Sequence, residues 1–254
     1  MNTPHAVFFD LDETLITNTR EADALFAEVF RQQFAALDAT LFEPFMDVLR
    51  KHAAHVWDNM FDHPTSPSDQ LRQAMASAIE AVGGGAGRGG AFFEAFTAAA
   101  AANCRLNPNA REVLETLRGN GLRLGIITNG FEALQIAKIR RHGLDEIMDA
   151  VIVSEQAGAH KPSPKVFEFA LRKLGMTAAC AWHVGDHVIN DVAGAAGVGL
   201  GTVYYNPALA VDEAASAFPA SGEFPTHVIT DLAELSELLA VPGVGGRISR
   251  STLC

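Results

Sequence analysis

Residues 6–16 read Ala6-Val7-Phe8-Phe9-Asp10-Leu11-Asp12-Glu13-Thr14-Leu15-Ile16, an apolar run that ends abruptly in two carboxylates. Its first four residues are all apolar and do not alternate with polar ones, which predicts a strand buried on both faces. Asp10 then stands just past the carboxyl end of that strand, where open α/β sheets place their ligands. Asp10 and Asp12 project to the same side of an extended chain, and a divalent cation with oxygen ligands would relieve their repulsion. The alternative is a solvated turn after the strand, and this stretch alone leaves both interpretations open.

The composition narrows the class of protein. The chain has 254 residues, of which 48% are hydrophobic, and its formal net charge is −11. This length suits one large α/β domain or a core domain with a smaller insert. The acidic balance argues against nucleic acid polymers and anionic membranes as partners, but it is compatible with a small anionic substrate, because a metal and one lysine can reverse the local field. The three cysteines form neither a zinc pattern nor a disulfide framework, and no signal peptide or membrane-spanning stretch is recognisable, so we expect a cytoplasmic protein.

Residues 18–103 carry the periodicity of helices. Phe26, Phe30 and Phe34 recur at every fourth position, and further apolar stripes run through 41–52 and 71–82. The glycine-rich stretch 83–90 lacks the Gly-Lys-Ser/Thr ending of a phosphate-binding loop and follows no strand, so we predict a flexible connection between helices. The whole segment is therefore expected to form a helical domain that is inserted after the first strand.

From residue 107 onward, expected helices and strands alternate. Strands are predicted at 122–127, 150–153, 180–184 and 201–205, with an edge strand at 227–229. This order predicts an α/β fold with a doubly wound, mostly parallel, Rossmann-like sheet and right-handed crossovers. We therefore expect a core domain formed by residues 1–17 and 104–241, an all-helical cap domain at 18–103 and a disordered tail at 242–254.

Polar side chains follow three of the predicted buried strands at the point where each strand ends. In a parallel sheet these ends share one edge, so the groups should converge in space, and a loop after a fourth strand brings a lysine to the same edge. The set consists of Asp10, Asp12, Thr14, Thr128, Asn129, Lys161, Asp186 and Asp191. Carboxylates, hydroxyls, backbone N–H groups and one lysine are the groups that metal-assisted phosphoryl transfer requires.

Four short motifs, in this order, resemble those of the haloacid dehalogenase superfamily, most of whose members are phosphatases. They are Asp10-Leu11-Asp12-Glu13-Thr14, Ile127-Thr128-Asn129-Gly130, Lys161-Pro162, and Gly185-Asp186 through Asn190-Asp191. The helical insert resembles the α-helical cap of that family. The segments 126–135 and 153–158 are similar to those of bacterial YjjG-type nucleotidases and of N-acylneuraminate 9-phosphatases.

The resemblance implies a role for each acid. Asp10 would attack phosphorus and carry the phosphoryl group, and Asp12 would protonate the leaving oxygen and then activate the hydrolytic water. Mg²⁺ would be the cofactor, held by Asp10, by the backbone carbonyl of Asp12 and by Asp186. Asp191 would act around the metal through water, or by orienting Lys161.

The remaining motif residues are implied to handle the phosphate. Thr128 and the backbone of Asn129 would bind phosphoryl oxygens, and Lys161 would stabilise the charge on the nucleophile and the phosphate. Thr14 would fix the turn after Asp12 rather than contact the substrate.

Asp12 also indicates the type of reaction. Dehalogenases of the superfamily lack an acid at this position, so its presence favours hydrolysis of phosphate esters over dehalogenation. The expected partner is a small phosphorylated metabolite, first of all a nucleoside monophosphate, with a sugar phosphate or N-acylneuraminate 9-phosphate as the alternative. A non-catalytic phosphate-binding or scaffold protein on the same fold is a hypothesis of another class, against which the intact acids argue. The chain is expected to be a monomer or a homodimer.

Several cap and core residues have competing interpretations. His52, His55 and Trp57 either line a substrate pocket or pack two cap helices together, and we predict packing. His183 lies inside a predicted strand and is expected to be a core histidine with its hydrogen bonds satisfied.

Overall fold

The computed structural model describes residues 4–209 and 225–239. The chain forms two compact units: the first comprises residues up to 17, 105–129 and 142 onward, and the second comprises 18–104 and 130–141. The second unit thus joins the predicted cap segment with the helix that follows Gly130. The expected domain boundaries stay predictions, and the expected tail at 242–254 lies outside the described residues.

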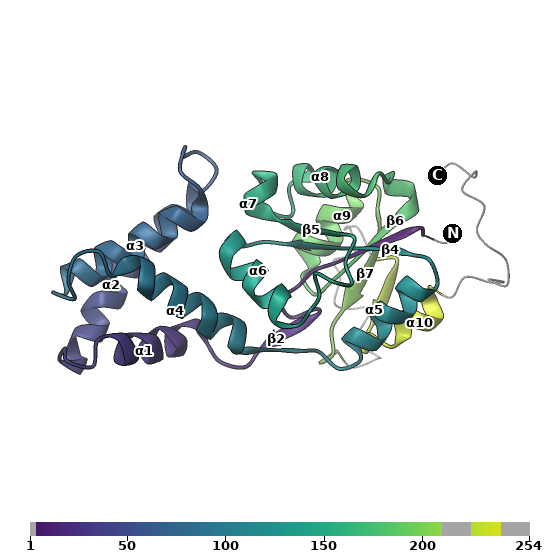
Figure 1. The fold of residues 1–254 in the computed structure, drawn as a ribbon. Coiled ribbons are helices and arrows are strands. Elements are labelled where there is room, and N and C mark those ends of the chain that lie inside the picture. Colours follow the sequence, from purple (N-terminus) through teal and green to yellow (C-terminus); the bar gives the residue numbers. More distant parts are fainter. Residues whose placement is uncertain (1–3, 210–224, 240–254) are drawn as a thin grey trace. The chain divides into compact units, whose positions relative to one another are not determined.

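The first unit is built on a six-stranded parallel sheet, as predicted, in the order β5-β4-β1-β6-β7-β8 (Figure 1). The strands are β1 (Ala6–Phe9), β4 (Arg123–Thr128), β5 (Ala150–Val153), β6 (Ala181–Gly185), β7 (Gly201–Tyr205) and β8 (His227–Ile229). β1 lies between β4 and β6, and all four of its side chains are fully buried. Burial on both faces explains why its sequence does not alternate.

Helices cover both faces of this sheet, which makes the fold doubly wound (Figure 1). One face carries α7 (Ser154–Ala157), α8 (Pro164–Leu174) and α9 (Gly194–Ala196), and the other carries α5 (Ala110–Gly119) and α10 (Glu234–Leu238). A short 3-10 turn, η2 (Ala178–Cys180), precedes β6. The chain after β6 forms a π-helical turn, η3 (Val188–Ala193).

The second unit is helical, as the apolar stripes predicted. It contains α1 (Ala22–Gln33), the turn η1 (Ala39–Leu41), α2 (Phe42–Asp58), α3 (Pro67–Ala81), α4 (Gly89–Ala102) and α6 (Glu132–Arg141). Phenylalanines dominate its core, and the rings of Phe26 and Phe96 stack with centroids 3.9 Å apart. The glycine-rich stretch connects α3 to α4, as predicted.

Two short strands were not predicted. β2 (Ile16–Asn18) and β3 (Cys104–Leu106) pair as a two-stranded sheet where the chain passes between the two units. Each has a polar or charged residue at its centre, Thr17 or Arg105, and so lacks an apolar run that would indicate a strand.

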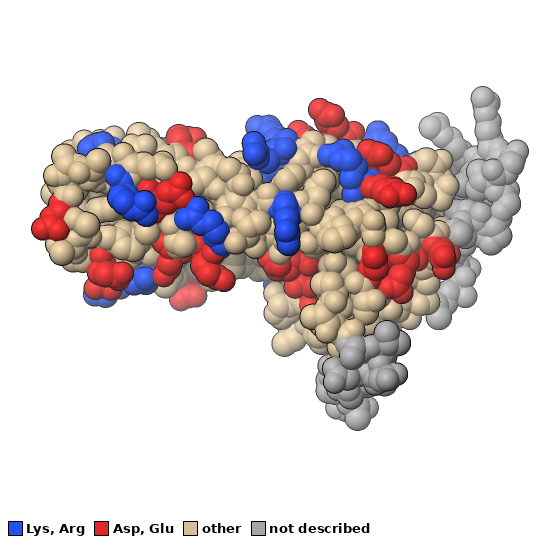
Figure 2. All heavy atoms as spheres, turned by 90° about the horizontal axis from the view of Figure 1, so that it is seen from below, with Lys and Arg blue, Asp and Glu red and all other residues tan. Residues whose placement is uncertain are grey.

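The surface of the described residues is mixed in charge. On the face drawn in Figure 2, lysine and arginine side chains lie interspersed with aspartate and glutamate. None of the helices within 4–209 and 225–239 is long and apolar enough to cross a membrane.

Candidate active site

Neighbouring parallel strands bring the predicted acids to one edge of the sheet. Phe9, the last residue of β1, pairs with Val184 of β6, and the backbone N–H of Asp10 donates a hydrogen bond to the Val184 carbonyl at 2.9 Å. Asp10 and Asp186 directly follow these strands, and Thr128 ends β4 on the other side of β1. The predicted convergence at the carboxyl edge is therefore confirmed for these three residues.

Lys161 supplies the positive charge of the site. Its Nζ lies 2.7 Å from Oδ1 of Asp10 and 2.6 Å from Oδ1 of Asp191. The lysine side chain is only 3% exposed, so both ion pairs are shielded from water. Buried, charge-assisted hydrogen bonds of this length hold the three side chains in one arrangement.

The side chain of Asn129 fixes the backbone of Lys161. Its Nδ2 donates to the Lys161 carbonyl at 3.1 Å, and its Oδ1 accepts from the Lys161 N–H at 2.8 Å. The neighbouring Thr128 is 1% exposed, and its hydroxyl donates to the Asn129 carbonyl at 3.3 Å. Asn129 therefore joins the loop after β4 to the loop that delivers the lysine, which its sequence motif did not reveal.

Asp191 is held by protein groups at both carboxylate oxygens. Oδ1 faces Lys161 Nζ and, at 3.0 Å, Nε2 of His183, while Oδ2 accepts from the backbone N–H of His187 at 3.0 Å. The carboxylate packs directly on Gly185, where an added Cβ would overlap it. Position 185 therefore requires glycine, and these contacts anchor Asp191.

Three carboxylates nevertheless lie close enough together to surround a cation. One oxygen from each of Asp10, Asp186 and Asp191 lies within 4.8 Å of the others. All three carboxylates offer an oxygen to such a site, and Asp191 is also held by Lys161, His183 and the backbone N–H of His187. Oxygen donors of this kind, backed by a lysine that offsets part of the charge, fit a hard divalent cation.

Burial and charge set the protonation of this cluster. Burial raises the pKa of Asp10 from 3.8 to about 7 against the opposing effect of Lys161, and burial followed by the charge of Asp191 also raises the pKa of Asp186. Burial would raise the pKa of Asp191 too, but Lys161 and His183 hold it below its usual value. The pKa of Lys161 is raised, because Asp10 and Asp191 outweigh its burial. Asp191 and Lys161 are thus a stable ion pair, whereas Asp10 is the member that a cation would help to ionise.

We predict that Asp10 makes the metal-free protein less stable as the pH rises from 4 to 7. The folded state keeps the Asp10 proton up to about pH 7, whereas the unfolded chain releases it near 3.8, so the folded state binds more protons in this window and its free energy of unfolding falls. The full shift corresponds to at most about 4 kcal/mol. The measurement is the free energy of unfolding in chelator against pH for wild type and Asp10→Asn. A difference between the two that does not change with pH would contradict the assignment.

Asp12 and Thr14 sit in the turn after β1. Asp12 is half-buried and stands outside the carboxylate cluster, and Glu13 after it adopts a left-handed backbone with φ +59°. Thr14 is fully buried, and its hydroxyl donates to Oδ1 of Asp186 at 3.3 Å. The threonine thus orients the Asp186 carboxylate, a contact that its position in the motif did not predict.

His183 is the site residue whose surroundings were predicted wrongly. It is buried in β6, as expected, but its Nδ1 has no hydrogen-bond partner among the described residues, so it is not a satisfied core histidine. Its Nε2 instead contacts Asp191. His183 and Gly185 lie two positions apart on one side of β6, and Asp191 packs on that side, which the sequence alone does not show.

The packing prediction was also wrong for His52 and His55, whereas Trp57 does pack on another ring of its unit. His52 and His55 are exposed on α2 rather than packed between helices, and Trp57 is 41% exposed. The Trp57 ring meets the Phe131 ring edge-on, with centroids 5.9 Å apart. Helical periodicity alone did not show which side of α2 these side chains occupy.

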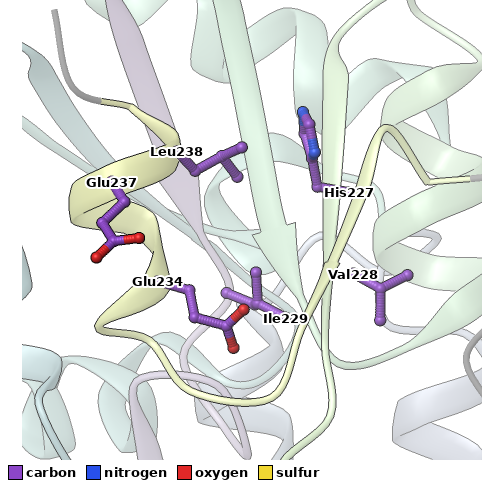
Figure 3. Close-up of a pocket in the computed structure, with 6 residues that line it drawn as sticks. All are labelled: His227, Val228, Ile229, Glu234, Glu237 and Leu238. Carbon is purple, nitrogen blue, oxygen red and sulfur yellow. The ribbon is translucent and has the colours of Figure 1, made fainter. Parts of the chain in front are cut away.

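A cavity of ≈ 410 Å³ lies elsewhere in the first unit, at the edge strand β8. Its lining residues are His227, Val228, Ile229, Glu234, Glu237 and Leu238 (Figure 3). Glu234 accepts hydrogen bonds from the backbone N–H groups of Thr230 and Asp231, which places it at the start of α10. None of the predicted site residues lines this cavity.

Comparisons with known proteins agree with this arrangement. Residues 4–199 match the family described as haloacid dehalogenase-like hydrolase. The ribulose-1,5-bisphosphate 5-phosphatase of Halopiger xanaduensis is 37% identical over 151 residues, 59% of this chain and 63% of that protein. The pyrimidine 5′-nucleotidase YjjG of Escherichia coli is 36% identical over 151 residues, 59% of this chain and 64% of that protein. The chain therefore spans less than two thirds of the length of these two relatives.

Two further comparisons cover more of the chain. A glyceraldehyde 3-phosphate phosphatase of Pyrococcus abyssi is 31% identical over 209 residues, 78% of this chain and 80% of that protein. The crystal structure of a 2-haloacid dehalogenase from Pseudomonas syringae superposes with a TM-score of 0.74 and 28% identity, covering 93% of this chain and 98% of that one. Sequence motifs, sheet topology and the family match agree, and the chain belongs to the haloacid dehalogenase-like hydrolase family.

Proposed function

We propose that the protein is an Mg²⁺-dependent phosphomonoester hydrolase that acts on a small phosphorylated metabolite through a phosphoryl group carried by Asp10. One observation carries the proposal: the buried Asp10 carboxylate lies 2.7 Å from Lys161 and shares one sheet edge with Asp186. A protein that only binds phosphate would gain nothing from clustered acids at its anion site, because they repel the ligand. A nucleophile and a cation site, by contrast, both need carboxylates.

Each residue has a defined task in this reaction. An Asp10 oxygen forms a bond to phosphorus while the bond to the leaving oxygen breaks, and Asp12 gives that oxygen its proton. Asp12 then takes a proton from the water that attacks phosphorus, and Asp10 is released. Lys161 remains paired with Asp10 and stabilises the charge on the phosphoryl oxygens.

Mg²⁺, when bound by Asp10, Asp186 and the Asp12 carbonyl, would supply positive charge that offsets the negative phosphate. Thr14 would hold Asp186 for this purpose, through the hydrogen bond of 3.3 Å. Thr128 and the Asn129 backbone would bind phosphoryl oxygens at the end of β4. Asp191 would hold Lys161 through the contact at Oδ1 rather than ligate the ion.

For the substrate we propose a nucleoside monophosphate first. The similarity to a pyrimidine 5′-nucleotidase supports it. The alternative is a sugar phosphate or N-acylneuraminate 9-phosphate, and the similarity to phosphatases of ribulose bisphosphate and glyceraldehyde phosphate supports a sugar phosphate. The structure is also similar to that of a 2-haloacid dehalogenase, but we disfavour dehalogenation. Asp12 can protonate a leaving oxygen, whereas a halide leaves without a proton.

The test is phosphate release from a panel of nucleoside monophosphates, sugar phosphates and N-acylneuraminate 9-phosphate, each with Mg²⁺ and with chelator. Halide release from 2-haloacids serves as the comparison. Release of phosphate from one nucleotide group that disappears with chelator would support the proposal in full. Release from sugar phosphates alone would move the assignment to the alternative, and halide release without phosphate release would refute the phosphatase.

We predict that Asp12→Ala slows both halves of the reaction, by about 10²–10⁴-fold, because it removes a general acid and base. The Asp12 backbone carbonyl remains, so Mg²⁺ affinity should change little. Rapid-quench measurement of phosphorylated Asp10, together with calorimetric titration of Mg²⁺, checks both parts. Complete loss of Mg²⁺ binding would contradict the role given to the side chain.

A further inference from the structure

We propose that His183 is a positioning residue of the active site, which holds the Asp191 carboxylate in the orientation that binds Lys161. The expected effect of His183 on turnover rests on the proposed function, whereas its hydrogen bond to Asp191 is independent of that function. None of the four sequence motifs contains this histidine, and it lies too deep to touch a substrate, because its side chain is 0% exposed.

An unbroken line of contacts leads from His183 to the nucleophile. Nε2 of His183 lies 3.0 Å from Oδ1 of Asp191, the same oxygen lies 2.6 Å from Nζ of Lys161, and Nζ lies 2.7 Å from Asp10. All four residues belong to the first unit. The lysine and the histidine therefore share one carboxylate oxygen, and the position of that oxygen sets the position of the lysine.

The ring can make this contact in only one tautomer. A carboxylate only accepts hydrogen bonds, so Nε2 must carry a proton. Nδ1 has no partner among the described residues, and burial lowers the pKa of His183, so the ring is neutral and its single proton is on Nε2. The Phe167 ring packs edge-on at 5.4 Å and fixes the ring plane.

Other supports of Asp191 do not replace this one. The backbone N–H of His187 binds Oδ2, and Gly185 gives the carboxylate its space. Only His183 and Lys161 bind Oδ1 in the part of the chain that the structure describes. Without the histidine, Oδ1 is held by Lys161 alone, and its position no longer sets the distance from Lys161 to Asp10 as firmly.

The experiment uses a matched set of variants in the full chain. Glutamine places its amide nitrogen at the same number of bonds from Cα as Nε2 of histidine, asparagine places it at the position of Nδ1, and phenylalanine keeps the ring without a donor. We expect His183→Asn and His183→Phe to lower kcat by about 10–100-fold, as substitutions of orienting residues do, and His183→Gln to restore most of it. Trp182→Phe, a ring change at the next position of β6 on the opposite side of the strand, is the packing control and should leave kcat unchanged.

Each outcome decides the proposal. Activity is measured with the panel ester that gives the fastest release, alongside Tm for every variant. Loss with asparagine and phenylalanine but not with glutamine supports positioning, while equal losses for glutamine and asparagine that follow Tm, or unchanged kcat in all three, overturn it. If wild type hydrolyses no ester, the proposed function fails, and the histidine is tested separately by ¹⁵N NMR of the wild-type ring. An Nε2–H tautomer supports the contact, and an Nδ1–H tautomer overturns it.

Discussion

Replacing Asp10 with asparagine is expected to abolish phosphate release, with kcat reduced by about 10⁴-fold or more, because an amide forms no phosphoryl ester. The change is nearly isosteric at a buried site, so the fold should persist. It also removes the carboxyl group whose pKa burial raises to about 7, so the variant should be at least as stable as wild type at pH 8 in chelator. The measurements are steady-state phosphate release and mass spectrometry of the acid-quenched protein, which should lose the phosphorylated peptide.

Glu168→Gln is the matched control for this substitution. Glu168 is an exposed residue of α8, 58% exposed at its side chain, and the substitution removes one negative charge outside the cluster. Its kcat should equal that of wild type. Hydrolysis by Asp10→Asn within tenfold of wild type would rule out the covalent mechanism and would leave water as the nucleophile.

Replacing Lys161 with methionine is expected to have the second largest effect. The stem of the side chain is preserved, but Asp10 and Asp191 lose the ammonium that lies within 2.7 Å of each of them. An uncompensated buried charge costs about 3–5 kcal/mol of folding free energy. Loss of the group that stabilises the phosphoryl oxygens should also reduce kcat by about 10²–10³-fold.

Denaturant unfolding at pH 8, with and without Mg²⁺, measures the stability part of this prediction. Added Mg²⁺ should recover part of the loss, because it restores positive charge beside Asp10. Lys165→Met is the control, since Lys165 is exposed and donates only to the Gly158 carbonyl at 3.1 Å in the described structure. A Lys161→Met protein as stable as this control would mean that the ion pairs contribute nothing to folding.

The sheet and its active edge could be predicted because both follow from local patterns. The uninterrupted apolar run of β1 indicates a buried strand. Parallel strands place Asp10, Thr128 and Asp186 at one edge of the sheet, independently of the conformation of the connecting loops. The position of Lys161 was predictable in the same way, as a cation in a loop on that edge. These statements need only chain order and strand direction.

The contacts within the site could not be predicted, because they depend on side-chain geometry across loops. Asn129 holds the Lys161 backbone, and Thr14 orients Asp186, through single hydrogen bonds that no spacing rule gives. The exposure of His52 and Trp57 depends on which side of α2 faces the rest of its unit. The π-helical turn that carries Asp191 follows no periodicity used for helices or strands.

The packing of Asp191 on Gly185 also constrains how such a site can change during evolution. Any side chain at 185 would displace the carboxylate and, with it, the anchor of Lys161. Descendants that keep catalytic activity must therefore keep both residues. In a lineage that has lost the activity, substitutions become tolerated at both positions. A family member in which both 185 and 191 are substituted while Asp10 is retained would therefore be one that lost catalytic activity before its nucleophile was replaced.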